Sequence, residues 1–218
     1  MPRALFEKTG NAVWISHLDL MRLFQRSFKR AGLPLTHTQG FNPRPSVSIA
    51  LPLSVGVESD CELLDFDLDG IDVNCEEICS RLNQALVEGV HVRKVYDDGL
   101  KIRHLALLRS RLALEYDGGV PANGQQAIQN LFLRPDLTVE KKGKNGVTDQ
   151  DIIPMIRSVQ VTAGEREIFV EVLACCQNPT LNPMQIAAAV DKYLPELKPD
   201  HVRCRRLEIY DTNEKLFR

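Results

Sequence analysis

Four basic residues near the N-terminus are spaced to lie together on one face of a helix. At positions i, i+4, i+7 and i+8 the sequence has Arg22, Arg26, Lys29 and Arg30, here called the basic stripe. No acidic residue stands four positions from any of them, so local ion pairs of that spacing do not explain the pattern. Such a face neutralises phosphates when it meets a polyanion, although it could also be a solvated helix surface.

A turn that follows the basic stripe combines an aromatic ring, an amide and a guanidinium. Phe41, Asn42 and Arg44 stand in the run Gly40–Pro45, whose glycine and two prolines exclude regular structure. Stacking and bidentate hydrogen bonding hold the bases of single-stranded RNA; alternatively, Phe41 is buried and the prolines shape a crossover. The candidate nucleic-acid-binding residues are Lys8, His17, Arg22, Arg26, Lys29, Arg30, Phe41, Asn42 and Arg44.

Ser16, His17 and Asp19 have the residue types of a catalytic group but not its geometry. Adjacent residues of a helix point about 100° apart, so Ser16 and His17 cannot act as a nucleophile and its base. Ser16 is instead predicted to be an N-cap, with Asp19 completing a variant of the capping box. His17 then lies in the first turn, where backbone N–H groups favour anions. It could bind a phosphate, pack or cap the helix, or act as an acid or base; no catalytic residue is assigned.

The cysteines do not form a metal or cluster motif. Cys75 and Cys79 match the first half of C-x3-C-x2-C, but the third position is Leu82, and a cluster with one open iron needs three thiolates. Cys175 and Cys176 are adjacent in a predicted strand and point to opposite faces. No metal and no cofactor is therefore expected, and the six thiols are expected to be reduced, as in a cytoplasmic protein.

Hydrophobic periodicity predicts the elements that position these residues. Helices are expected over about 17–31, 75–88, 124–133 and 184–194. Extended segments are expected over 4–8, 12–15, 35–38, 46–51, 61–68, 90–96, 108–116, 157–162, 167–175 and 201–210. Residues 137–142 and 147–152 flank an Asn-Gly turn and are expected to form a strand pair or a mobile basic loop.

The order of these elements predicts an α+β fold with two halves. Each half resembles β-α-β-β-α-β, so we expect two ferredoxin-like halves with antiparallel sheets. The boundary is expected near 99–106. Residues 1–100 would form an N-terminal ferredoxin-like half that carries the basic helix and the turn, and residues 101–218 would form a C-terminal one.

Composition and charge exclude several classes of protein. The 218 residues are 44% hydrophobic and 26% charged, which is typical of globular proteins and not of disordered or fibrous ones. No apolar run reaches the roughly 18 residues of a membrane span, and the polar N-terminus does not resemble a signal peptide. The net charge of −2 is unevenly distributed, with +5 over 1–50 and −9 over 51–100, so a polyanion partner remains compatible with it.

Four stretches of the sequence closely resemble the radical-SAM-linked protein family, a bacterial domain of unknown function. They are Ser16–Arg22, Arg30–Pro34, Gly40–Pro45 and Leu51–Ser59. The domain is fused to the C-terminal side of radical SAM proteins or encoded beside one. The resemblance therefore implies a radical SAM enzyme as partner. Family members are often encoded near an E/G-type ribonuclease and ribosomal proteins, which implies RNA or ribosomal components as further partners. It implies no catalytic residue.

Three functions are compatible with these observations. The preferred one is a non-catalytic module that binds RNA or a ribonucleoprotein and presents it to a radical SAM partner. The second is a protein–protein adaptor without RNA binding, in which the acidic segment 58–77 docks a basic partner. The third is a metal-independent enzyme that processes or modifies RNA, for which His17 or His37 would need a second titratable group nearby.

Overall fold

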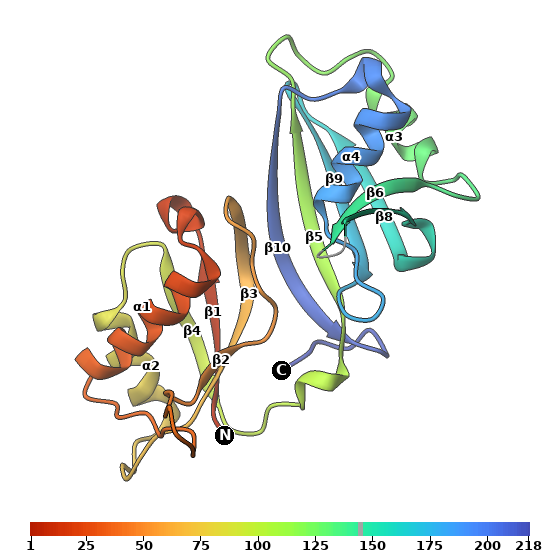
Figure 1. Cartoon of the computed structure of the whole chain (residues 1–218). Coiled ribbons are helices and arrows are strands. Elements are labelled where there is room, and N and C mark those ends of the chain that lie inside the picture. Colours follow the sequence, from red (N-terminus) through yellow and green to blue (C-terminus); the bar gives the residue numbers. More distant parts are fainter. Residues whose placement is uncertain (144–145) are drawn as a thin grey trace. The chain divides into compact units, whose positions relative to one another are not determined.

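The computed structural model describes residues 1–143 and 146–218 and divides the chain into two compact units. Unit 1 consists of residues 1–102 with Arg218, and unit 2 of residues 103–217. Each unit combines antiparallel strands with two α-helices among its described residues (Figure 1). The predicted α+β class with antiparallel sheets is confirmed.

Unit 1 contains four strands and two α-helices in the chain order β-α-β-β-α-β. The elements are β1 (Arg3–Lys8), α1 (His17–Arg30), β2 (Val47–Ile49), β3 (Val57–Phe66), α2 (Cys75–Ala85) and β4 (Val90–Tyr96). The strands lie in the order β4-β1-β3-β2, and each neighbouring pair is antiparallel. The two helices cover one face of this sheet (Figure 1), so the opposite face of α1 is left for solvent or a ligand.

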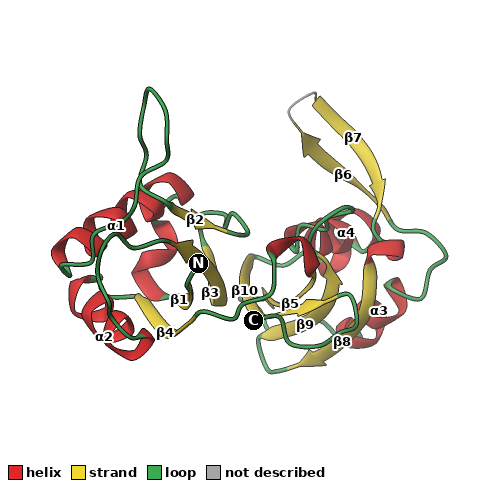
Figure 2. Ribbon diagram, turned by 90° about the horizontal axis from the view of Figure 1, so that it is seen from below, coloured by secondary structure: helices red, strands yellow, loops and turns green. Residues whose placement is uncertain are grey.

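Unit 2 repeats this order with a strand pair inserted. Its elements are β5 (Leu105–Glu115), α3 (Gly124–Leu131), β6 (Thr138–Gly143), β7 (Gly146–Asp151), β8 (Ile156–Ala163), β9 (Glu167–Cys175), α4 (Met184–Tyr193) and β10 (His201–Asp211). The main strands lie in the order β10-β5-β9-β8, while β6 and β7 pair only with each other (Figure 2). The predicted strand pair is therefore present; residues 144 and 145 of its turn lie outside the described residues.

Two expected extended segments of unit 1 are wrong. Gly10–Trp14 forms a 3-10 helix, η1, instead of the extended piece over 12–15, because Gly10 has a φ of +56° and turns the chain after β1. The segment 35–38 makes only isolated bridges, Leu35 with Leu68 and His37 with Pro45. Prolines at positions 34 and 45 lack the N–H groups that a regular strand ladder needs.

Aromatic packing fixes the position of α1 on the sheet. The ring of Phe24 meets that of Phe6 on β1 at 4.8 Å between centroids, and Phe28 meets Phe66 on β3 at 4.9 Å. All four rings are fully buried, and full burial of one large apolar side chain contributes about 1.5–3 kcal/mol. This packing sets the rotation of the helix and turns Arg22, Arg26 and Lys29 outward.

The cysteines are all free thiols, and two of them, Cys75 and Cys79, lie on α2. The Cys75 thiol donates to Asp97 at 3.3 Å, and the Cys79 thiol donates to the Val92 carbonyl at 3.3 Å. Burial raises the pKa of both thiols. Within the described residues, no three His, Cys, Asp or Glu side chains are grouped to hold a metal ion. Every helix in that part of the chain is too short or too polar to cross a bilayer.

Candidate nucleic-acid interface

Ser16 caps α1 as the sequence predicts, but the Asp19 carboxylate bonds to the Ser16 hydroxyl where a capping box would use the Ser16 backbone N–H. The Ser16 hydroxyl accepts a hydrogen bond from the Asp19 backbone N–H at 3.2 Å and donates to the Asp19 carboxylate at 2.7 Å. The hydrogen bond from the Ser16 hydroxyl to the Asp19 carboxylate lowers the pKa of Asp19, and the hydrogen bond from Arg22 lowers it further. Ser16 is therefore the N-cap, and its hydroxyl is engaged in the helix start.

The basic stripe divides into free and engaged cations. Arg22, Arg26, Lys29 and Arg30 are all exposed. Arg22 pairs with Asp19 at 3.0 Å, so the expectation that no ion pair accounts for the stripe is wrong for this residue: the acid stands three positions away, not four. Arg30 donates to the Ala85 carbonyl at 2.5 Å and fastens α1 to the end of α2. Among the described residues, Arg26 and Lys29 make no ion pair.

Lys8 does not belong to this surface. Its side chain is fully buried, and Nζ donates to the carbonyl oxygens of Val13 at 3.1 Å and Ile15 at 2.8 Å. The amine thus satisfies backbone carbonyls at the C-terminal end of η1. Its place among the candidate nucleic-acid-binding residues is an error, because a buried amine that satisfies backbone carbonyls cannot reach a phosphate at the surface.

His17 is half-buried at the first turn of α1. Its Nδ1 atom is buried and has no hydrogen-bond partner among the described residues. That edge of the ring therefore faces the protein and is closed to a surface phosphate. Of the roles considered for His17, packing agrees best with this placement.

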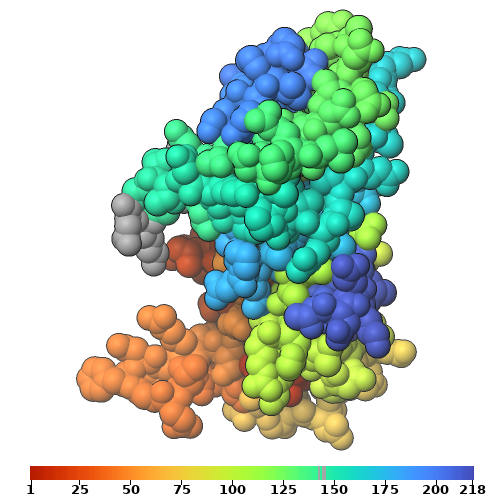
Figure 3. All heavy atoms as spheres, turned by 90° about the vertical axis from the view of Figure 1, so that its right-hand side faces the viewer, coloured from red at the N-terminus to blue at the C-terminus, as the bar shows by residue number. Residues whose placement is uncertain are grey.

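The loop between α1 and β2 carries the predicted aromatic turn on the outside of unit 1. The side chain of Phe41 is fully exposed, so the alternative of a buried Phe41 is excluded. Asn42 and Arg44 are exposed as well. In Figure 3 the orange part of unit 1, which the colour bar places around residue 40, stands out from the surface. The base of the loop is closed by Thr38, whose N–H donates to the Arg44 carbonyl at 2.8 Å.

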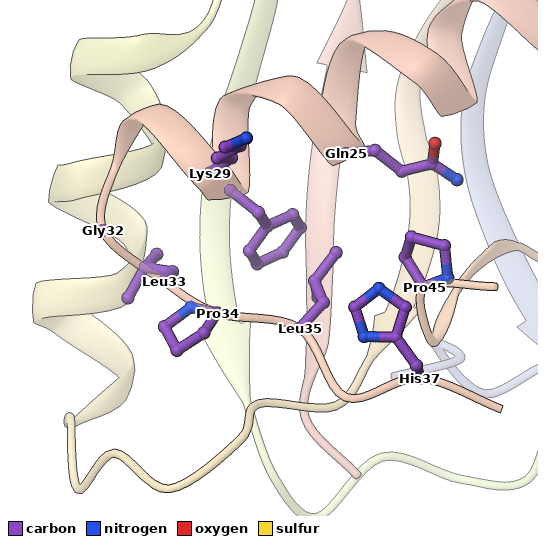
Figure 4. Close-up of a pocket in the computed structure, with 9 residues that line it drawn as sticks. Gln25, Lys29, Gly32, Leu33, Pro34, Leu35, His37 and Pro45 are labelled. Carbon is purple, nitrogen blue, oxygen red and sulfur yellow. The ribbon is translucent and has the colours of Figure 1, made fainter. Parts of the chain in front are cut away.

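A pocket lies between the second half of α1 and the chain on either side of this loop. Its volume is about 480 Å³. Figure 4 shows Gln25 and Lys29 on the helix above it, and His37 beside Pro45 at one end. The lining residues are Gln25, Phe28, Lys29, Gly32, Leu33, Pro34, Leu35, His37 and Pro45. The pocket joins one member of the basic stripe, Lys29, to the base of the Phe41 loop.

Sequence reasoning identified only Lys29 among these lining residues. Of the others, Gln25 and Phe28 fall within the helix expected over 17–31, His37 within the extended segment expected over 35–38, and Pro45 at the end of the Gly40–Pro45 turn. None of these was predicted to line a pocket, and His37 was proposed only as part of a catalytic pair. The one local signal was that Pro34 and Pro45, on either side of this segment, have no backbone N–H to give to a regular strand ladder.

Comparison with protein families places the chain. A model described as "Uncharacterized protein conserved in bacteria (DUF2344)" matches residues 2–183. The chain belongs to this family. The match includes residues 2–102 of unit 1, and with them the basic stripe, the Phe41 loop and the pocket. No curated protein is similar enough to this DUF2344 chain to match it.

One solved structure resembles the DUF2344 chain in fold. A chain from "Crystal Structure of a Cbf5-Nop10-Gar1 Complex" matches with a TM-score of 0.52 and 10% sequence identity, over 95% of this chain. The match covers 48% of that chain, so the DUF2344 chain spans about half its length. A second structure, of an unknown protein from Galdieria sulphuraria, matches with a TM-score of 0.26 and 10% identity, over 94% of this chain and 96% of that one.

Proposed function

We propose that this protein is a non-catalytic module that binds single-stranded RNA, free or in a ribonucleoprotein, through unit 1. The surface that would bind it consists of Arg22, Arg26 and Lys29 on α1 together with Phe41, Asn42 and Arg44 on the loop. In this proposal the cations neutralise phosphates and the exposed ring stacks on a base.

The observation that carries the proposal is the fully exposed ring of Phe41 on a loop whose base lies against α1. An aromatic side chain without protein contacts loses the free energy of burial, and a base that stacks on it recovers part of that free energy. Arg44 on the same loop and Lys29 at the adjacent pocket supply positive charge next to the ring. An aromatic ring between cations is the usual composition of a single-strand binding surface.

The fold gives this surface a familiar scaffold. When the strands of each unit are numbered along the chain, with the β6–β7 pair left out, both sheets have the order 4-1-3-2. This order is β4-β1-β3-β2 in unit 1 and β10-β5-β9-β8 in unit 2. Together with the β-α-β-β-α-β order of the elements, it supports the assignment of both units as ferredoxin-like, with β6 and β7 as an insertion in the second. The fold itself identifies no ligand.

A radical SAM enzyme in the cytoplasm is the proposed recipient of the RNA. This part of the proposal is supported by the four sequence stretches that resemble the radical-SAM-linked family. Crosslinking in the native cell, with sequencing of RNA and mass spectrometry of proteins, tests it. We expect an RNA crosslinked within residues 16–44 and a radical SAM enzyme in the same sample. Recovery of that enzyme without RNA would replace the proposal with the adaptor described next.

A protein–protein adaptor is the second candidate, and exposed apolar side chains favour it. Trp14, Leu18 and Val55 of unit 1 are 70%, 66% and 52% exposed. Large apolar side chains on a surface often mark a protein contact. Gly56 donates its N–H to the Val13 carbonyl at 2.9 Å, which brings the loop with Val55 next to Trp14.

Charge reversal on α1 separates the two candidates. We expect Arg26→Glu with Lys29→Glu to weaken binding of a labelled single-stranded RNA by at least about tenfold, because two phosphate contacts become repulsive. Fluorescence anisotropy measures the affinity. The matched control is Lys94→Glu with Lys101→Glu, which makes the same charge change at exposed positions of unit 1 outside the surface. Equal affinities of the two double variants would rule out the proposed surface, as would the absence of RNA binding by the unmodified protein.

A further inference from the structure

We infer that the pocket between α1 and the Phe41 loop receives one unstacked nucleobase of the bound strand. The inference rests on the proposed function and adds a binding site for a single base. It follows from the size of the pocket, from its walls, from its charge and from the hydrogen bonds that hold it open.

The size and the walls of the pocket suit a flat aromatic ligand. Its volume of about 480 Å³ lies within the range of roughly 300–1,000 Å³ that small-molecule sites occupy. Five of its nine lining residues are apolar: Pro34 and Pro45 reach the surface, and Phe28, Leu33 and Leu35 are buried beneath them. The face of a nucleobase is apolar and its edge is polar, so apolar walls stabilise the ring without selecting its edge.

Polar groups stand where they can contact the edge of such a ring. Gln25 carries both a donor and an acceptor in its side-chain amide, and Gln bonded to a base edge is a common form of recognition. The exposed imidazole of His37 lies beside Pro45 at one end of the pocket (Figure 4). An imidazole can stack on a base or hydrogen-bond to it. The pocket thus offers two separate polar contacts to one planar ring.

The charge of the pocket favours a nucleotide over a neutral or cationic ligand. Lys29 lies on its rim, and none of the lining residues is acidic. Arg26 stands one turn earlier on α1 and is exposed. A base in the pocket would bring its own phosphate to these cations, which a neutral side chain of a protein partner would not do.

The walls are held in place before any ligand binds. The Leu33 N–H donates to the Phe28 carbonyl at 2.9 Å, and the Asp69 N–H donates to the Pro34 carbonyl at 2.9 Å. The Thr36 N–H donates to the Asp67 carbonyl at 2.9 Å. The first bond ties the segment after α1 to the helix itself, and the other two tie it to the chain beyond β3. A preformed pocket avoids the entropic cost of ordering its walls on binding.

An RNA with one missing base tests the pocket directly. We compare a short single strand that carries 2-aminopurine at one position with the same strand abasic there, since both present equal phosphates. We expect the unmodified protein to bind the abasic strand about tenfold more weakly, as loss of one stacked base predicts. We expect His37→Ala and Gln25→Ala to bind the 2-aminopurine strand more weakly and to reduce the preference. The controls are Gln39→Ala, in the same loop, and Gln84→Ala, on α2, at two exposed positions. These variants should retain the affinity for the 2-aminopurine strand and the preference over the abasic strand.

Nucleoside monophosphates test the pocket without the rest of the strand. In methyl NMR of the full chain, we expect adenosine or uridine monophosphate to shift the methyl signals of Leu33 and Leu35 and not those of Leu133, which is exposed in unit 2. If the methyl signals shift but RNA does not bind to the basic stripe, the pocket binds a nucleotide and the proposed function is refuted. RNA binding that depends on Arg26 and Lys29, with neither methyl shifts nor discrimination against the abasic strand, would refute the pocket alone.

Discussion

Two lysines of unit 1 show how little the residue type says about the role of a charge. Lys8 and Lys29 are both basic residues close to α1 in the sequence. Lys29 lies on the rim of the pocket, whereas Lys8 is fully buried and donates to two backbone carbonyls. Sequence reasoning counted both as phosphate ligands. Burial of an amine that is bonded to carbonyls has no signature in composition, because the carbonyls belong to the backbone of a 3-10 helix and its C-cap Ile15, which the sequence did not predict.

Replacement of Lys8 tests its structural role. We expect Lys8→Met to lower the free energy of unfolding by about 1–3 kcal/mol, because the carbonyls of Val13 and Ile15 would lose a buried donor. Urea titration followed by circular dichroism measures the change. The matched control Lys29→Met should stay within about 0.5 kcal/mol, since Lys29 is exposed. If the two variants were equally stable, the hydrogen bonds of Lys8 would contribute nothing net to the fold.

At the scale of elements, most boundaries followed from local signals. Helix α1 was expected over 17–31 and spans His17–Arg30, because Ser16 caps it and Gly32, at a φ of +66°, ends it. Strand β4 was expected over 90–96 and is Val90–Tyr96. Such signals depend on residues only a few positions apart, so they can be recognised in one sequence without an alignment.

The pocket could not be predicted in the same way. It joins α1 to a segment whose position is set by hydrogen bonds to Asp67 and Asp69, more than thirty residues further along the chain. No local pattern encodes such a contact. The residues that would have suggested a site, Gln25 and His37, stand twelve positions apart in elements of different kind, so no motif connects them.

The cap of α1 makes a prediction at this scale. We expect Ser16→Ala to destabilise unit 1 by about 1 kcal/mol at pH 7, the usual cost of removing an N-cap side chain. The structural basis is the bond from the Asp19 N–H to the Ser16 hydroxyl. Thermal unfolding monitored by circular dichroism measures the effect. Ser48→Ala, at an exposed position of β2, is the control and should be nearly neutral.

The same cap predicts a dependence on pH. The pKa of Asp19 is lowered from its ordinary value of 3.8, so its contribution to stability is present above that pH and is lost as the pH falls through the lowered pKa. The Ser16 hydroxyl donates to the ionised carboxylate. The difference between the unmodified protein and Ser16→Ala should therefore be constant near neutrality and narrow in acid. A difference that widened below pH 3.8 would contradict this assignment.

At the scale of the whole molecule, the distribution of charge matters more than its sum. The net charge is −2, and the segment 51–100 alone carries −9. Residues 51–100 and the basic stripe belong to the same unit. Unit 1 would therefore repel a polyanion except at a local basic surface. Such a charge pattern favours one orientation of a bound strand over others, because the many acidic residues of 51–100 repel its phosphates.

The dependence of RNA affinity on salt concentration measures how many phosphates the surface neutralises. For a single strand, the slope of log affinity against log salt concentration is about −0.7 for each phosphate that is neutralised. Four exposed cations of the proposed surface, Arg22, Arg26, Lys29 and Arg44, would therefore give a slope of about −3. Arg26→Ala should make the slope shallower by about 0.7, while the control Lys94→Ala should leave it unchanged. A slope near zero in the unmodified protein would remove the phosphates from the interaction and favour the adaptor that docks through Trp14, Leu18 and Val55.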